Sequence, residues 1–519
     1  MMKKTVIGVH ITIFALLVMY FIYISPLQVF DGDDWYFIGS MRSPFPMWGA
    51  WNPTRVLPEV LMPLSGYVGA FIIYPFNHNY IDSLSISDAL LVSLIITIFI
   101  YCFYLVITER FKVNWKSGIV SELFFLVMFF FLYKKTNQPS YTGFWTNDLT
   151  CAFFYLIPGL VCGSIVMYIL TSNKNFCDDL NSMGDLKIGF FLLILYFAIF
   201  SSTQFNILLA TYSFLMLTNV VIKNRFNFKY FISSTWIYLI ILFGWIISIF
   251  FDLHGQRAVG ITNSNNTSLK EKIVYTINNC LNLMKLQNKY ALMLSVVIIG
   301  LALIVSVINK DKAFLKLMIQ SGICFLLTFI YLFMAYMKTG SDYANRPDAM
   351  WAVIYLFIFI TSISFSWLLK AVPKFNLIAP IVVCLIALFS LNFNYRPVPS
   401  LCSPWPLKLT AINNRLYGYS PTTVKNIDNC IIDQVKKADN EGEKSVIVKV
   451  PYNKGVVKAT EPTSNWPQPY YTSTWLQNTL YSHNIIRARI KITFKPDRSV
   501  NRKFPENPWN QQAHIAIEK

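Results

Sequence analysis

The chain has 519 residues, of which 55% are hydrophobic, 16% are aromatic and only 13% are charged. Soluble domains carry about 25% charged residues, so this composition excludes an ordinary soluble enzyme and indicates a polytopic α-helical membrane protein. The formal net charge of +18 does not call for nucleic acid as a partner, because the cytoplasmic loops of membrane proteins collect Lys and Arg.

The first apolar run, residues 5–25, follows two lysines and is long enough to cross a bilayer. It lacks a small-residue cleavage site and many apolar runs follow it, so it predicts an uncleaved helix rather than a signal peptide. With it, the sequence predicts eleven membrane spans. The other ten are residues 85–107, 118–133, 151–171, 188–201, 205–222, 230–251, 291–309, 314–336, 350–369 and 376–393.

Residues 56–76 are also apolar enough to span a membrane, but they contain three prolines, two glycines and Glu59. Counting them as a span would reverse every later loop and place Arg110, Lys112 and Lys116 outside, against the positive-inside rule. We therefore interpret this run as a re-entrant or interfacial segment, which requires protein or water around its backbone.

The distribution of basic residues predicts a cytoplasmic N-terminus, because Lys and Arg are concentrated in the segments that this topology places inside. Residues 1–393 then form a membrane domain with a first outer loop at 26–84, and residues 394–519 lie outside. The outer tail is polar, with strand-like runs at 445–450 and 485–494, and predicts a small α/β or β-rich domain. In an exported tail, Cys402 and Cys430 could form a disulfide or remain two thiols.

Three acids, Asp31, Asp33 and Asp34, stand just after the first span in the stretch "FDGDDWYF" (30–37). Such acids can be a solvated turn or a helix N-cap. Neighbouring carboxylates also raise one another's pKa, which suits a general base near neutral pH. The sequence has no pattern of metal ligands, although carboxylate pairs suit hard metal ions.

The other outer loops supply arginines and aromatic residues, as in "WNPTRVLPE" (51–59). Guanidinium groups match the oxygens of a phosphate, and tryptophan rings can stack on sugars. The alternative is an ordinary aromatic belt with loop charges. The candidate residues for binding a sugar phosphate are Arg55, Glu59, Arg257, Arg346, Trp35, Trp51 and Trp145, and those for binding an acceptor in the tail are Trp466, Tyr470, Tyr471 and Trp475.

The layout resembles the GT-C superfamily of membrane glycosyltransferases, and most closely the serotype-converting O-antigen glucosyltransferases carried by temperate phages of enteric bacteria. The residues that carry this resemblance are "FDGDDWYF" (30–37), "NPTRVLPE" (52–59), the segment 56–76 and the aromatic stretch "EPTSNWPQPYY" (461–471). The resemblance covers the whole layout, whereas its specific motifs are short.

The resemblance implies an inner-membrane enzyme whose active site faces the periplasm. It would transfer glucose, with inversion, from undecaprenyl-phosphate-glucose to a sugar of the lipopolysaccharide O-antigen. Separate proteins would synthesise the lipid-linked donor and flip it across the membrane. The superfamily's base maps onto Asp31, Asp33 or Asp34, with Asp33 and Asp34 favoured because they directly precede the aromatic pair. Some members of the superfamily use a divalent metal ion.

Two other classes of function stay open at this stage. A transporter or flippase of lipid-linked sugars would carry polar residues along its spans, and these spans are largely uncharged. An O-antigen polymerase is also polytopic with basic outer loops, but such enzymes place their large loops between later helices.

Overall fold

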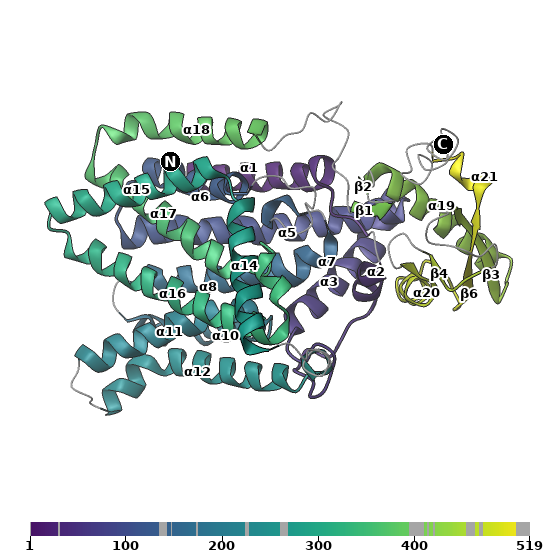
Figure 1. Cartoon of the computed structure of the whole chain (residues 1–519), viewed down its shortest axis with the longest axis horizontal. Coiled ribbons are helices and arrows are strands. Elements are labelled where there is room, and N and C mark those ends of the chain that lie inside the picture. The colour runs from purple at the N-terminus through teal and green to yellow at the C-terminus, as the bar shows by residue number, and fades with distance from the viewer. Residues whose placement is uncertain are drawn as a thin grey trace.

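A computed structural model describes most of the chain. The described residues are 2–29, 32–133, 143–146, 148–172, 175–223, 228–259, 268–393, 409–412, 415–418, 421–452, 462–466 and 471–504. They form a bundle of long helices lying side by side, with a smaller C-terminal region packed at one end of it (Figure 1). We call this end the tail end and the other the opposite end.

Each of the eleven predicted spans coincides with a helix, and short π-helical turns extend several of them. The helices are α1 (Met2–Met19), α5 (Tyr80–Leu105), α6 (Trp115–Phe131), α8 (Ile157–Thr171), α10 (Asp185–Ile199), α11 (Thr203–Lys223), α12 (Phe228–Leu253), α15 (Lys289–Ile308), α16 (Lys312–Thr339), α17 (Trp351–Ala371) and α18 (Phe375–Phe393). The π-helical turns are η1 (Tyr20–Ile24) after α1, η3 (Val106–Arg110) after α5 and η6 (Ala152–Leu156) before α8.

Nine helical stretches in the described residues are long and apolar enough to cross a membrane. Eight of them are predicted spans and the ninth is Val56–Asn77, whereas α6, α10 and the apolar part of α18 are shorter. By length and composition, these helices are those of a polytopic membrane protein.

Side-chain caps define where several of these helices begin. Asn79 accepts a hydrogen bond from the backbone N–H of Asp82 at the start of α5, and Asn114 does the same for Ser117 at the start of α6. Asp311 caps α16 by accepting from the backbone N–H of Phe314. These short polar side chains satisfy N–H groups that have no partner inside their helix, so each apolar run is bounded by a polar turn.

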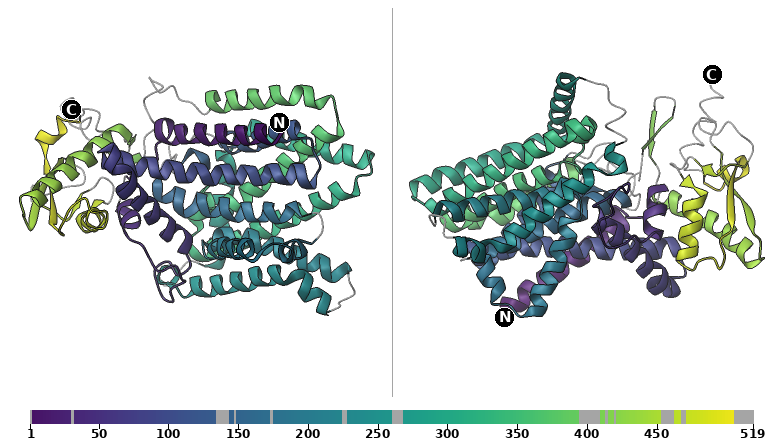
Figure 2. Two further views of the ribbon diagram at one scale, coloured as in Figure 1. Left: turned by 180° about the vertical axis from the view of Figure 1, so that it is seen from behind. Right: turned by 90° about the horizontal axis from the view of Figure 1, so that it is seen from below.

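The segment that we interpreted as re-entrant is one continuous helical stretch. It comprises α3 (Val56–Val68), η2 (Gly69–Ile73) and α4 (Tyr74–Asn77). Its first residue donates a backbone hydrogen bond to the carbonyl of Phe200, which follows α10, and Lys436 in the C-terminal region donates to Tyr74 near its other end. The ribbon slants across the tail end of the bundle (Figures 1 and 2). The segment therefore returns the chain to the end from which it came, although its length and composition would also permit a span.

The C-terminal region is a small α/β unit. Strand β3 (Ser445–Pro451) pairs in parallel with β6 (Lys491–Asp497), with Val448 opposite Phe494. Helices α19 (Pro421–Asn440), α20 (Ser473–Ser482) and α21 (Arg498–Asn501) accompany this pair. Two short antiparallel ladders join β1 (Leu409–Ile412) to β2 (Arg415–Gly418), and β4 (Asn465–Trp466) to β5 (Tyr471–Thr472).

The predicted strand over residues 445–450 is present as β3, but the run 485–494 forms a strand only from Lys491 onwards. The preceding residues turn around the end of α19, where the Asp439 carboxylate accepts from the backbone N–H groups of Arg487 and Ala488. These side-chain hydrogen bonds take the place of a strand ladder.

Helix α20 fixes the C-terminal region to the bundle. Ser482 Oγ donates to the carbonyl oxygen of Gly39 at 3.0 Å, and Thr479 Oγ1 donates to that of Trp35. Gly39 ends α2 (Gly32–Gly39), the helix that carries the predicted acids. A Cβ at Gly39 would lie 2.7 Å from the Thr479 backbone, and one at Gly66 would lie 2.7 Å from the Ile38 backbone. The two glycines therefore allow α20, α2 and α3 to approach one another closely.

A buried histidine completes this contact. His483 follows α20, and its Nδ1 lies 2.6 Å from the hydroxyl of Tyr80 at the start of α5. Only 1% of the histidine is exposed. Burial lowers the pKa of His483 to about 4, so the imidazole is neutral in the folded protein at neutral pH.

We expect the C-terminal region and the turn before α10 to lie on opposite sides of the membrane, because the described part of that region, up to residue 504, and this turn are at opposite ends of the bundle (Figure 1). Alkaline phosphatase fused after the last residue should be active in intact cells, whereas phosphatase fused after Lys187 should be inactive. Activity from the second fusion together with none from the first would contradict the predicted orientation.

We expect stability to fall as the pH decreases from about 6.5 to about 4. In this range the unfolded chain binds a proton at His483 that the folded protein does not. The free energy of unfolding is therefore at its full value above about pH 6.5 and is lower by about 2 kcal/mol at pH 5. The melting temperature of His483→Asn should therefore fall less between pH 7.5 and pH 5 than that of the unmodified protein. His78→Asn, at an exposed histidine, is the matched control and should behave like the unmodified protein.

Candidate functional site

The two described acids of α2 have different surroundings. Asp33 is exposed, whereas 1% of Asp34 is exposed. Asp34 Oδ1 accepts hydrogen bonds from the backbone N–H of Thr150 at 2.9 Å and from its hydroxyl at 2.5 Å. Asp34 therefore positions α2 against the start of α7 (Leu149–Cys151), and Asp33 is the one of this pair that faces solvent. Asp31 lies outside the described residues.

Residues 148–156, which contain α7 and η6, link α2 to the arginines. Asp148 caps this segment by accepting from the backbone N–H of Cys151 at 2.7 Å. The ring of Phe154 packs on Phe37 of α2, with centroids 4.4 Å apart. The guanidinium carbon of Arg55 lies 5.6 Å from the same Phe154 ring, so one short segment contacts both α2 and the start of α3.

The three predicted phosphate-binding arginines converge on two tyrosines. Arg55 and Arg346 lie 5.8 and 4.9 Å from the ring centre of Tyr155. Arg346 and Arg257 lie 5.4 and 5.5 Å from that of Tyr343, and Arg257 also donates to the Tyr343 hydroxyl. Such cation–π contacts hold guanidinium groups without neutralising them. We call these five residues the arginine–tyrosine cluster.

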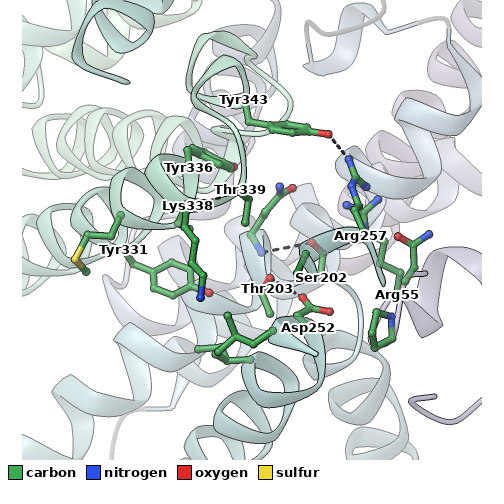
Figure 3. A pocket seen from close by; sticks show the side chains of 18 of the residues that line it. Arg55, Ser202, Thr203, Asp252, Arg257, Tyr331, Tyr336, Lys338, Thr339 and Tyr343 are labelled. Atoms are coloured by element: carbon green, nitrogen blue, oxygen red, sulfur yellow. Dashed lines mark hydrogen bonds between the residues drawn. The ribbon is translucent and has the colours of Figure 1, made fainter. Parts of the chain in front are cut away.

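A cavity of about 320 Å³ opens beside this cluster at the tail end of the bundle. Its walls come from the loop before α3, the start of α11, the end of α12, the end of α16 and the turn η7 (Ser341–Asn345). Arg55, Arg257 and Lys338 line it together with Asp252 (Figure 3). Three cations against one acid give the cavity a positive balance that suits an anionic ligand.

Two threonines hold the acid of this cavity. Asp252 Oδ1 accepts from the Thr54 hydroxyl at 2.5 Å, and its Oδ2 accepts from the Thr203 hydroxyl at 2.8 Å. Within the described residues, Arg55, Arg257 and Lys338 form no ion pair with a carboxylate. Their charges are therefore available to a ligand, and Asp252 is a fixed acceptor on the same wall.

Arg346 differs from the other two arginines of the cluster. It forms an ion pair with Asp348, with Nη2 and Oδ2 at 2.6 Å and Nε and Oδ1 at 3.1 Å. Burial raises the pKa of Asp348, and the charge of Arg346 opposes this rise. Because the guanidinium is already paired in two places, Arg346 orders the tyrosines of the cluster rather than offering a free charge.

Glu59 lies outside the cavity and organises the loop before α3. Its carboxylate accepts from Arg42 Nη1 at 2.8 Å and from Asn52 Nδ2 at 2.7 Å. Arg42 Nη1 also donates to the backbone carbonyl of Asn52 at 2.7 Å. This network positions Trp51, which is exposed and lines the cavity.

The other predicted tryptophans are not equivalent to Trp51. Trp35 and Trp145 are buried, and Trp145 Nε1 donates to the carbonyl of Phe130, so their placement does not favour stacking on a sugar. Trp475 of α20 packs against Tyr36 of α2, with centroids 5.4 Å apart. The structure thus brings one predicted acceptor residue next to the acidic helix.

The remaining predicted tail residues are only partly covered by the structure. Trp466 and Tyr471 are paired positions in the backbone register of the β4–β5 ladder, while Tyr470 and Cys402 lie outside the described residues. The choice between a Cys402–Cys430 disulfide and two thiols therefore lies outside the described residues. Among the described residues, no three His, Cys, Asp or Glu side chains gather as a metal site would require.

Sequence reasoning did not single out Lys338, Tyr155, Tyr343 or Arg42 as site residues. Lys338 and Tyr343 stand in the loop "KTGSDYANRPDA" (338–349), where their nearness to Arg346 was an available signal. Tyr155 stands within an apolar run and looks like a packing residue there.

Comparison of the chain with protein-family models, with curated proteins and with solved structures finds no match.

Proposed function

We propose that this protein is a membrane glycosyltransferase that takes a sugar from a lipid phosphate carrier and transfers it to a glycan. The observation that carries the proposal is the cavity lined by Arg55, Arg257 and Lys338. It is linked to the acidic helix α2 through Phe154, whose ring contacts both Arg55 and Phe37. A phosphate leaving group carries its own negative charge, so it requires cations more than an acid catalyst.

The donor phosphate would lie against the unpaired cations of the cavity. Guanidinium groups held on tyrosine faces present their N–H groups in a fixed direction, which favours an anion with several oxygens. The cavity lies where helices α11, α12 and α16 end, so a carrier chain could remain among the helices while its phosphate reaches the cations.

The acceptor hydroxyl would lose its proton to a carboxylate while its oxygen attacks the sugar carbon that bears the phosphate. The bond between the sugar carbon and the phosphate oxygen breaks, and its electron pair leaves with the phosphate. Because the attack comes from the side opposite the phosphate, the configuration of the sugar carbon is inverted. Asp33 is the favoured base because it is exposed on α2, whereas Asp34 is occupied by Thr150. Asp252 is the second candidate, because it lines the cavity itself.

The acceptor would bind between α2 and the C-terminal region. Tyr36, on the same helix as Asp33, and Trp475 of α20 present two aromatic rings from these two parts of the chain. Aromatic rings of this kind pack against the apolar faces of sugars. The resemblance in layout adds the finer part of the proposal: glucose as the sugar, undecaprenyl phosphate as the carrier, the O-antigen as the acceptor and the periplasm as the compartment.

The proposal is tested by expressing the protein in an enteric strain of known O-antigen and weighing the repeat unit. One added hexose per repeat supports transfer. A changed chain-length distribution with unchanged repeats would instead support a polymerase.

A buried ionisable pair gives some support to a transporter as a second candidate. His10 of α1 and Glu122 of α6 approach to 3.2 Å, and Glu122 is fully buried. Ionisable residues inside membrane helices often mark transport pathways. A transporter would leave the repeat unit unchanged in mass, so the same measurement separates the two candidates.

Asp33→Asn should lower the transfer rate by about 10²–10⁴-fold at a normal protein level, because it removes a general base and keeps the size of the side chain. Asp34→Ala should instead lower the melting temperature and the protein level, because it removes the buried carboxylate that accepts two hydrogen bonds from the half-buried Thr150, at a cost of about 1–3 kcal/mol. Hexose incorporated per protein molecule and melting temperature separate the two effects. Full turnover in Asp33→Asn with loss in Asp252→Asn would move the base to Asp252.

Arg55→Gln and Arg257→Gln should each raise the donor concentration needed for half-maximal rate by about tenfold or more, because each removes a charge-assisted contact to the phosphate. Lys285→Gln is the matched control, since Lys285 is exposed on α14 (Leu269–Leu286) and does not line the cavity. Equal KM values for all three variants and the unmodified protein would argue against a phosphate in this cavity.

A further inference from the structure

A second and larger cavity, of about 740 Å³, lies at the opposite end of the bundle, away from the C-terminal region. It opens between the ends of α8, α11 and α17 and the beginnings of α12 and α16. Its size is within the range of pockets that bind small molecules. None of the residues that line it belongs to the arginine–tyrosine cluster or to the cavity beside it.

Four basic side chains surround the mouth of this cavity: Arg110, Lys112, Lys316 and Lys370. Arg110 Nη1 donates to the carbonyl of Ser172 at 2.9 Å, and Lys370 Nζ donates to that of Phe111 at 2.7 Å. These contacts with neutral carbonyl groups position the two side chains and do not cancel their charges. Lys112 has an acidic neighbour, Glu109, at 3.7 Å in an exposed pair.

Asp311 is the acidic residue that lines the cavity, and its two oxygens are occupied. Oδ1 accepts from the backbone N–H of Phe314, and Oδ2 accepts from the indole N–H of Trp367, each at 3.0 Å. Within the described residues, neither Arg110, Lys316 nor Lys370 forms an ion pair with a carboxylate. The mouth therefore carries an excess of positive charge that the protein does not balance.

The inner wall of the cavity has a different character. Tyr212, Tyr238 and Phe314 line it and are buried. A basic mouth above an apolar wall, at the ends of helices apolar enough to cross a membrane, is complementary to a molecule with a phosphate at one end and hydrocarbon at the other. A freely soluble phosphate compound would bind the basic side chains at the mouth and would make no contact with the apolar wall.

We propose that this cavity binds the phosphate headgroup of an anionic membrane lipid. Arg110, Lys316 and Lys370 contact the phosphate, and the glycerol and the first carbons of the chains lie against Tyr212, Tyr238 and Phe314. Basic pockets between membrane helices hold lipid headgroups by the same combination of charge and position. The site is independent of the proposed transferase, because it shares no residue with the cavity at the tail end.

The test uses the purified full-length protein, stripped of lipid in detergent and titrated with short-chain phosphatidylglycerol while bound lipid is counted by native mass spectrometry. The unmodified protein should bind the lipid saturably. The double variant Arg110→Gln/Lys316→Gln should bind it about thirtyfold more weakly, because each basic residue near an anionic headgroup contributes about 1 kcal/mol. Phosphatidylcholine of the same chain length should bind far more weakly to both.

The matched control removes two positive charges at the same end of the bundle without touching the cavity. Lys187→Gln/Lys374→Gln meets this need, because both lysines are exposed and neither lines the cavity. Its affinity for phosphatidylglycerol should stay within about threefold of that of the unmodified protein. An equal loss in both double variants would show general attraction to a basic surface and overturn the site.

A further arm separates lipid from soluble phosphate. Inorganic phosphate and glycerol phosphate, each added in excess, should leave most of the phosphatidylglycerol bound, because they lack the hydrocarbon that contacts the apolar wall. If either displaces the lipid at concentrations comparable to that of the lipid, the ligand is a soluble phosphate and the lipid assignment is wrong.

Discussion

The arrangement of the tail end depends on one buried carboxylate and the residue that satisfies it. Asp34 accepts two hydrogen bonds from Thr150, and these fix α2 on the segment 148–156. A buried carboxylate is costly without partners, so this contact determines the position and rotation of α2. The exposure of Asp33, the packing of Phe37 on Phe154 and the docking of α20 on Gly39 follow from that one placement.

The cations of the site are held by a different principle. Arg346 is paired with Asp348, whereas Arg55 and Arg257 rest on aromatic rings and have no carboxylate in an ion pair within the described residues. A ring face holds a guanidinium in place and leaves most of its charge unbalanced. Arg346 therefore has a structural ion pair, whereas the charges of Arg55 and Arg257 remain unbalanced and would be stabilised by an anionic ligand.

The positions of the helices could be predicted from the sequence because a bilayer requires apolar runs of a certain length. Residues 56–76 remain an interpretation, since Val56–Asn77 forms a helical stretch whose length and composition would also permit a span. The local roles could not be predicted. Neighbouring positions on a helix point about 100° apart, so Asp33 and Asp34 cannot share one environment, but composition does not tell which one is buried. Tyr155 stands in an apolar run, and its contact with Arg346, 191 positions away, has no local signal.

The glycines at the contact with α20 bear on how this protein could be recombined with others. Gly39 and Gly66 leave room for Thr479, Ile38 and His483, and any side chain at either position would collide with backbone. The C-terminal region is consequently not an independent module, because the surface of α20 is complementary to the surface formed by α2 and α3. A chimera with a C-terminal region from another protein, but without the matching α2 and α3, would pack wrongly where α20 contacts the acidic helix α2. A graft of the C-terminal region should therefore include residues 32–77, so that α20 and the helices α2 and α3 that it contacts come from the same parent protein.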